Sequence, residues 1–99
     1  MPTYLVLPLF WSDYAKLSPA EKAMFLQARD EFMEALALLG GQRFRPSLRI
    51  KGVQGYPGVF EMTWAKDGRA TFSFGPSQIP GEPHIVGRRI GDHSIFKNP

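Results

Sequence analysis

The residues with the clearest chemical capability lie near the end of the sequence, in the segment from His84 to Phe96. This segment is typical of a strand that ends in a turn, and it carries Arg89 and His93. Arginine offers a fixed fork of donors to a phosphate, and histidine, with an ordinary pKa of about 6.5, exchanges protons near neutrality. The pair therefore predicts phosphate chemistry, with a solvated strand arginine and a turn histidine as the alternative. If the extended conformation holds to the end, alternation places five residues on one face: Ile85, Gly87, Arg89, Gly91 and His93.

The second half of the sequence predicts strands with two chemically different faces. Alternation marks strands over residues 48–51, 59–64 and 70–74, and Asp67-Gly68 predicts a hairpin turn between the last two. The polar face is either a site or the exposed side of an ordinary sheet. The apolar face should meet a helix and comprises Phe60, Met62, Trp64, Ala70, Phe72 and Phe74. The opposite face holds Glu61, Thr63, Arg69, Thr71 and Ser73, joined by Arg49, Lys51, Arg89 and His93 if the register permits.

The first half predicts the elements that must support this sheet. The apolar run from Tyr4 to Trp11 is expected to form a strand, and residues 11–17 a short helical turn. Ser18-Pro19-Ala20-Glu21 has the form of a capping box with proline just inside a helix, and Gly40-Gly41 should end that helix. Its apolar stripe is expected to pack on the sheet. The stripe consists of Phe25, Ala28, Phe32, Leu36 and Leu39, while Gln27, Asp30, Glu31 and Glu34 lie on another side.

Length and composition limit the classes of function. The chain has 99 residues, which predicts one domain over residues 1–99, and 43% hydrophobic residues, which predicts a folded protein. It contains no cysteine, which excludes disulfides, thiolate catalysis and zinc held by sulfur. No apolar run approaches the roughly 20 residues of a membrane span. Residues 1–40 hold three basic and five acidic residues, whereas residues 41–99 hold nine and four, which indicates an anion-binding face.

Several segments distributed over nearly the whole chain resemble the RelE/ParE superfamily of small bacterial toxins from toxin–antitoxin pairs. The resemblance implies an α+β fold in which an N-terminal strand, a short helix and a long helix pack on one face of a small, mainly antiparallel four-stranded sheet. The closing segment is the most specific of them. The matching segments, after the opening strand, are residues 10–19, the long helix, 48–52, 59–61, 67–72 and 88–96.

The resemblance also implies catalytic residues. In ribonuclease members, a similar Arg-x-Gly-x-His segment followed by an apolar or aromatic residue supplies catalytic groups, which points to Arg89, His93 and Phe96. A charged residue on the second strand and an arginine at the start of the third are also typical, and Glu61 and Arg69 occupy these places. We expect His93 and Glu61 to transfer protons, and Arg69 and Arg89 to clamp the phosphate. A simple Glu61–Arg69 ion pair across the hairpin is the alternative for these two residues.

Ribonuclease members of the superfamily cut messenger RNA on the ribosome, without a metal, by attack of the ribose 2′-hydroxyl on the adjacent phosphate. The resemblance therefore implies that Arg49, Lys51 and Arg88 bind the RNA backbone. Phe96 is expected to stack on a splayed base or to fix the end of the strand, with an ordinary core aromatic as the alternative. No cofactor and no metal is expected.

The expected function is a cytoplasmic toxin that inhibits translation as a ribosome-dependent mRNA endoribonuclease. Its expected partners are messenger RNA, the ribosome and a cognate antitoxin, in a toxin–antitoxin hetero-oligomer and without a membrane. Exposed sheet edges and apolar helix margins are candidate surfaces for the antitoxin. Two alternatives remain: a ParE-like toxin directed at gyrase, and a non-catalytic module of the same fold that binds nucleic acid or protein.

Overall fold

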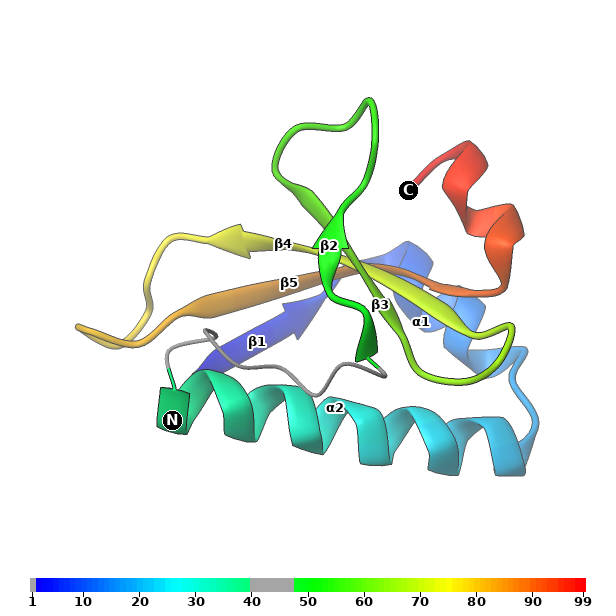
Figure 1. The fold of residues 1–99 in the computed structure, drawn as a ribbon, viewed down its shortest axis with the longest axis horizontal. Coiled ribbons are helices and arrows are strands. Elements are labelled where there is room, and N and C mark those ends of the chain that lie inside the picture. Colours follow the sequence, from blue (N-terminus) through cyan, green and yellow to red (C-terminus); the bar gives the residue numbers. More distant parts are fainter. Residues whose placement is uncertain (1, 40–47) are drawn as a thin grey trace.

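The computed structural model describes residues 2–39 and 48–99 and shows two helices beside a five-stranded sheet (Figure 1). Helix α2 lies along one side of the sheet, and the C-terminal segment lies on the other. No helix in this part of the chain is long and apolar enough to cross a membrane. The elements are β1 (Thr3–Val6), α1 (Pro8–Ala15), α2 (Pro19–Leu39), β2 (Lys51–Gly52), β3 (Val59–Thr63), β4 (Arg69–Gly75), β5 (His84–Gly91) and the 3-10 helix η2 (His93–Lys97).

The strands are ordered β1-β5-β4-β3-β2, so the two ends of the chain meet within the sheet. β1 runs parallel to β5, and the other neighbours are antiparallel. The predicted α+β fold with a mainly antiparallel sheet is confirmed, but the sheet has five strands instead of four. Because β1 pairs only with residues 84–87, no strand of the described residues lies beside the last part of β5 on that side.

Helix α2 begins where the capping box predicts. The Ser18 amide donates to Glu21 Oε1 at 2.8 Å, and the Glu21 amide donates to Ser18 Oγ at 3.1 Å. Two otherwise unpaired donors are thereby satisfied at the first turn. The predicted end at Gly40-Gly41 lies outside the described residues, as does the Leu39 side chain.

The core forms between the apolar stripe of α2 and the apolar face of the sheet. Phe32 packs edge-on against Phe72 with ring centroids 4.9 Å apart, and Phe25 meets Trp64 at 6.2 Å. Most of the predicted face is covered, but Phe74 lies near the end of β4 and remains 49% exposed. The prediction that Phe74 is buried in the core is therefore wrong, although its ring still contacts Phe60. The stripe residues Phe25, Ala28, Phe32 and Leu36 are buried with Met62, Trp64, Ala70 and Phe72.

Two predicted strands are shorter than expected. The apolar run after Thr3 stops being a strand at Val6, because Pro8 begins α1. Proline cannot donate to a sheet, and its fixed φ suits the first turn of a helix. The strand predicted from residue 48 begins only at Lys51, since Arg49 has a φ of 49° that breaks the extended backbone.

Candidate functional site

Four residues form one continuous row across the polar face of the sheet. Lys51 of β2 is paired with Glu61 of β3, Glu61 with Thr71 of β4, and Thr71 with Arg89 of β5. This cross-strand row brings together a lysine, a carboxylate, a hydroxyl and a guanidinium from four strands. The predicted register of Lys51, Glu61 and Arg89 on a single face is therefore confirmed.

Glu61 interacts with Lys51 and not with the arginine considered from the sequence. Its Oε1 lies 3.9 Å from Lys51 Nζ, and its side chain is only 14% exposed. The Lys51 side chain is 68% exposed and stays accessible to an anion. Neighbouring strands hold directly paired side chains close together, so the row keeps opposite charges adjacent.

A β-bulge in β5 separates the face of Arg89 from that of Ile85 and Gly87. Between Thr71 and Phe72 of β4, the partner on β5 moves from Arg89 to Gly87, which leaves Arg88 as the extra residue. Ile85 and Gly87 therefore lie on the apolar face, whereas Arg89 and Gly91 lie on the polar face. The prediction that alternation places all of these on one face is wrong, because a bulge shifts the side-chain alternation by one residue.

Asp13 of α1 holds Arg89 in place. Arg89 Nε donates to Asp13 Oδ2 at 2.6 Å, and Arg89 Nη2 donates to Asp13 Oδ1 at 3.1 Å. The Ile90 amide also donates to Asp13 Oδ2 at 3.2 Å, on the edge of β5 that β1 does not cover. Hydrogen bonding to Asp13 raises the pKa of Arg89 above its already high ordinary value. The guanidinium is thus permanently charged and fixed in orientation.

The packing of α1 against β5 explains how Asp13 reaches this position. Phe10 and Asp13 are buried on the same face of α1, one turn apart. Phe10 lies over Gly87, where a Cβ would come 3.3 Å from the ring and 2.8 Å from Val6. A glycine at this position lets the helix approach the strand closely enough for the carboxylate to reach Arg89.

The last residues of the chain lie on the same polar face. The main-chain oxygen of Pro99 accepts from Thr71 Oγ1 and from Arg88 Nε, each at 3.1 Å. The Asn98 carbonyl accepts from Arg89 Nη1 at 3.1 Å. Thr71 is completely buried beneath this segment. The C-terminal segment therefore covers the Arg89 end of the cross-strand row.

His93 lies outside the row because β5 ends at Gly91, and His93 begins the helix η2. Its side chain is exposed, and its ring meets Phe96 edge-on at 5.8 Å. Asp92 caps the helix by accepting from the Ser94 amide at 2.8 Å. Hydrogen bonding from the Ser94 side chain, and then from the Ser94 amide, lowers the pKa of Asp92. The predicted extension of the strand to His93 is wrong, since the cap turns the chain at Asp92.

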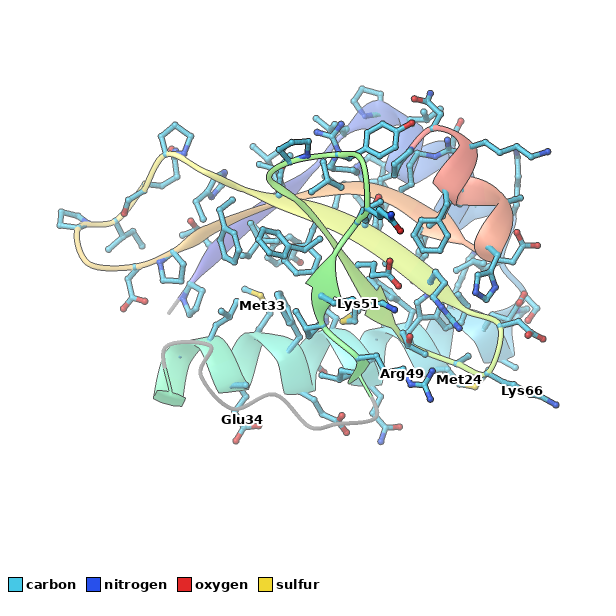
Figure 2. All side chains as sticks on the ribbon, turned by 45° about the horizontal axis from the view of Figure 1, so that its top comes forward. Met24, Met33, Glu34, Arg49, Lys51 and Lys66 are labelled. Carbon is cyan, nitrogen blue, oxygen red and sulfur yellow. The ribbon has the colours of Figure 1, made fainter. Side chains whose placement is uncertain are left out.

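Arg69 and Arg49 lie near the β3–β4 turn and do not join the row. Arg69 Nη1 donates to the carbonyls of Ala65, Lys66 and Gly68 at 2.9–3.3 Å, so this nitrogen secures the turn. Arg49 and Arg69 line a hollow of about 480 Å³ together with Lys66. Figure 2 shows Lys66 at this turn and Arg49 on the segment that precedes β2, whereas Lys51 lies in β2 itself.

Residues of β1, α1, α2 and the apolar face of the sheet line an apolar groove of about 350 Å³. Leu5, Trp11 and Leu26 line it and are 47%, 61% and 36% exposed. Strand β1, whose residues Tyr4, Leu5 and Val6 line the groove, lies at an edge of the sheet.

Within residues 2–39 and 48–99, no three histidine, aspartate or glutamate side chains come together as a potential metal site. Sequence reasoning missed Asp13 and the terminal main-chain oxygens, and it gave Thr71 a face but no role. The spacing of Phe10 and Asp13 on one helical face was a local signal for Asp13, but its partner lies 76 positions away. His84, for which no role was predicted, is buried with Nδ1 at 2.7 Å from Thr3 Oγ1.

The fold is that of the RelE/ParE toxins. Solved structures with this fold include a YoeB/ParE toxin from Agrobacterium tumefaciens, with a TM-score of 0.64 at 11% identity over 92% of this chain and 98% of that one. YafQ from E. coli strain BL21(DE3) has a TM-score of 0.64 at 9% identity, over 97% of this chain and 98% of that one. The archaeal RelE–RelB complex from Pyrococcus horikoshii OT3 has a TM-score of 0.61 at 14% identity, over 92% of this chain and 93% of that one. No protein-family model and no curated protein matches the sequence.

Proposed function

We propose that this chain is the toxin of a toxin–antitoxin pair and that it acts as a metal-independent, ribosome-dependent mRNA endoribonuclease. The observation that carries the proposal is the cross-strand row, which aligns Lys51, Glu61 and Arg89 on the polar face of a RelE/ParE-type fold. A row of alternating charge gives both cationic donors for a phosphodiester and a carboxylate for proton transfer.

The proposed reaction needs three kinds of group. A base removes the proton of the ribose 2′-hydroxyl, whose oxygen attacks the adjacent phosphorus, and an acid protonates the 5′-oxygen as it leaves. We assign proton transfer to His93 and Glu61. Arg89, fixed by Asp13, holds the charge that develops on the phosphate oxygens, and Arg69 assists through the nitrogens that the turn does not use.

The remaining cations bind the RNA on either side of the cut. Lys51 is exposed beside Glu61, and Arg88 lies at the bulge next to Arg89. Arg49 lies at the rim near the hairpin turn and contacts more distant phosphates. Phe96, half-buried against His93, provides a ring on which a base stacks.

The proposed partner is an antitoxin protein, and the proposed location is the cytoplasm, where ribosomes are. Support comes from structures of the same fold: RelE of Pyrococcus horikoshii OT3 is in a complex with RelB, and E. coli YafQ is in a complex with DinJ. Residues 1–99 would act as a single toxin domain that the antitoxin covers.

The test is cell-free translation with the wild-type chain and the variant His93→Ala, with message ends mapped by primer extension. We expect the wild type to cut message on ribosomes and the variant to lose at least about a hundredfold in rate, the usual contribution of a proton-transfer residue. Ser94→Ala alters an exposed side chain in the same turn and should retain cleavage.

The result also separates the alternatives. Intact message with continued synthesis would overturn the nuclease proposal, and inhibition of DNA supercoiling by gyrase in a parallel assay would then support the gyrase-directed toxin. Equal cleavage by His93→Ala and the wild type would retain the nuclease but remove His93 from its chemistry.

A further inference from the structure

The polar donors at the end of the row are already occupied by the chain itself. Thr71 Oγ1 and Arg88 Nε converge on one oxygen of Pro99, and Arg89 Nη1 binds the carbonyl oxygen of Asn98. Two neighbouring oxygens of one short segment thus receive three hydrogen bonds from β4 and β5. Two oxygens of one phosphodiester group present acceptors in a similar way.

The donors are fixed before any ligand arrives. Thr71 is fully buried beneath residues 98–99, and its hydroxyl needs a new acceptor when they leave. Asp13 binds the Nε and Nη2 side of Arg89, which leaves the Nη1 side directed at Asn98. Unpaired donors at such a position cost free energy, and an acceptor must therefore take the place of the segment when it moves.

We propose that Thr71 Oγ1, Arg88 Nε and Arg89 Nη1 form an oxyanion site for one phosphodiester group, and that residues 98–99 fill this site until such a group displaces them. Naming RNA as the source of that group depends on the proposed function. The binding of phosphate itself does not, because it requires only the three donors.

The displacement can be confined to the last two residues. Helix η2 is anchored by Ile95, which is 3% exposed and lies against Gly91. Asn98 is the residue after the helix, and its amide still donates to the Ile95 carbonyl at 3.1 Å. Breaking this hydrogen bond would free residues 98 and 99 and release both oxygens, while Ile95 keeps η2 in its place on the sheet.

The exchange favours an anion over the segment. The same donors bind either a main-chain or a phosphate oxygen, and a phosphodiester adds a negative charge that the guanidinium groups of Arg88 and Arg89 share. Docking of the segment keeps the donors satisfied in the absence of RNA. It also makes bound phosphate and a docked Asn98 mutually exclusive.

The test is titration of the ¹⁵N-labelled protein with inorganic phosphate, with chloride at equal ionic strength as the reference. We expect saturable shifts of the Asn98 amide and the Arg88 and Arg89 Nε–H resonances. The ¹⁵N relaxation of Asn98 should change to that of a mobile residue as phosphate saturates, while Ile95 remains ordered. A saturable phosphate site that leaves Asn98 ordered would overturn the displacement.

Variants test which side chains donate to phosphate and whether residues 98–99 compete with it. Thr71→Val and Arg88→Gln should each weaken phosphate binding about tenfold, whereas Thr71→Ser should retain it. Ser73→Ala, on the same strand and the same face as Thr71, is the matched control and should bind as the wild type. Pro99→Gly removes a buried ring that stabilises docking, and should tighten phosphate binding about fivefold.

These measurements are independent of message cleavage. Unchanged binding in both Arg88→Gln and Pro99→Gly would refute the oxyanion site even if the protein cuts message. Phosphate-driven release of Asn98 in a protein that cuts no message would retain the site and reject the proposed ribonuclease.

Discussion

Asp13 is the side chain that couples helix α1 to the arginine of the row. Its carboxylate is 9% exposed and accepts from two Arg89 nitrogens and from the Ile90 amide. We predict that Asp13→Ala lowers the free energy of unfolding by about 3 kcal/mol, because it leaves a half-buried guanidinium and a buried amide without their acceptor. Urea denaturation measures this change.

The matched control at the residue scale is Asp30→Ala. Asp30 pairs with Arg29 at 2.9 Å, but its side chain is 69% exposed. Exposed pairs contribute little, so the loss should stay below about 1 kcal/mol. Equal losses in the two variants would show that burial gives the Asp13–Arg89 pair no special weight.

The close packing of α1 on β5 limits the size of the residue at position 87. We predict that Gly87→Ala costs about 1–3 kcal/mol of unfolding free energy, because a Cβ at this position would lie 2.8 Å from Val6 and 3.3 Å from Phe10. Thermal unfolding measures the loss. Gly52→Ala serves as the control, since no atom lies within 4 Å of its added Cβ, and should unfold nearly as the wild type does. A wild-type Tm for Gly87→Ala would contradict the close approach.

Helix η2 should respond to acid through its cap. The hydrogen bond from Ser94 lowers the pKa of Asp92, so the cap is complete above the ordinary value of 3.8 and is lost as the pH falls through the lowered value. We predict that acid loosens η2 first, with hydrogen exchange at Ser94 and Ile95 rising below pH 3.8.

Asp92→Asn can still accept from Ser94 but does not titrate in this range. The variant should therefore lose the acid-dependent rise while retaining η2 at neutral pH. A rise of the same size in Asp92→Asn would assign the acid response to another group.

Over the whole molecule, the distribution of charge determines how the binding of RNA depends on salt. The cations on the polar face of the sheet include Lys51, Arg88 and Arg89. Helix α2 runs along the other side of the sheet (Figure 1). We predict that binding of single-stranded RNA weakens with salt at a log–log slope of about −2, the value for three phosphate contacts. Fluorescence anisotropy over a salt series measures the slope.

Lys51→Ala should reduce the magnitude of this slope by about 0.7, as expected for one lost phosphate contact. Lys22→Ala removes the same charge from α2, where Lys22 lies over the Tyr14 ring, and should leave the slope unchanged. Equal effects of the two lysines would point to general charge attraction without a defined face.

Much of the fold follows from local rules that the sequence displays. The capping box at Ser18 starts α2, Asp67-Gly68 lies in the hairpin connection between β3 and β4, and alternation sorts these two strands into two faces. These features depend on residues within a few positions of one another. They were therefore predictable, as was the meeting of Lys51 and Glu61 on one face once the strands are paired.

Only the tertiary structure decided the environment of Arg89. The bulge at Arg88, the carboxylate of Asp13 and the oxygens of residues 98–99 come from three distant parts of the chain. No local pattern marks a bulge, and no spacing reveals a partner 76 positions away. The sequence determined which groups are available, but packing of α1 and of the C-terminal segment on β5 determined which of them meet, because side-chain contacts depend on distances in space.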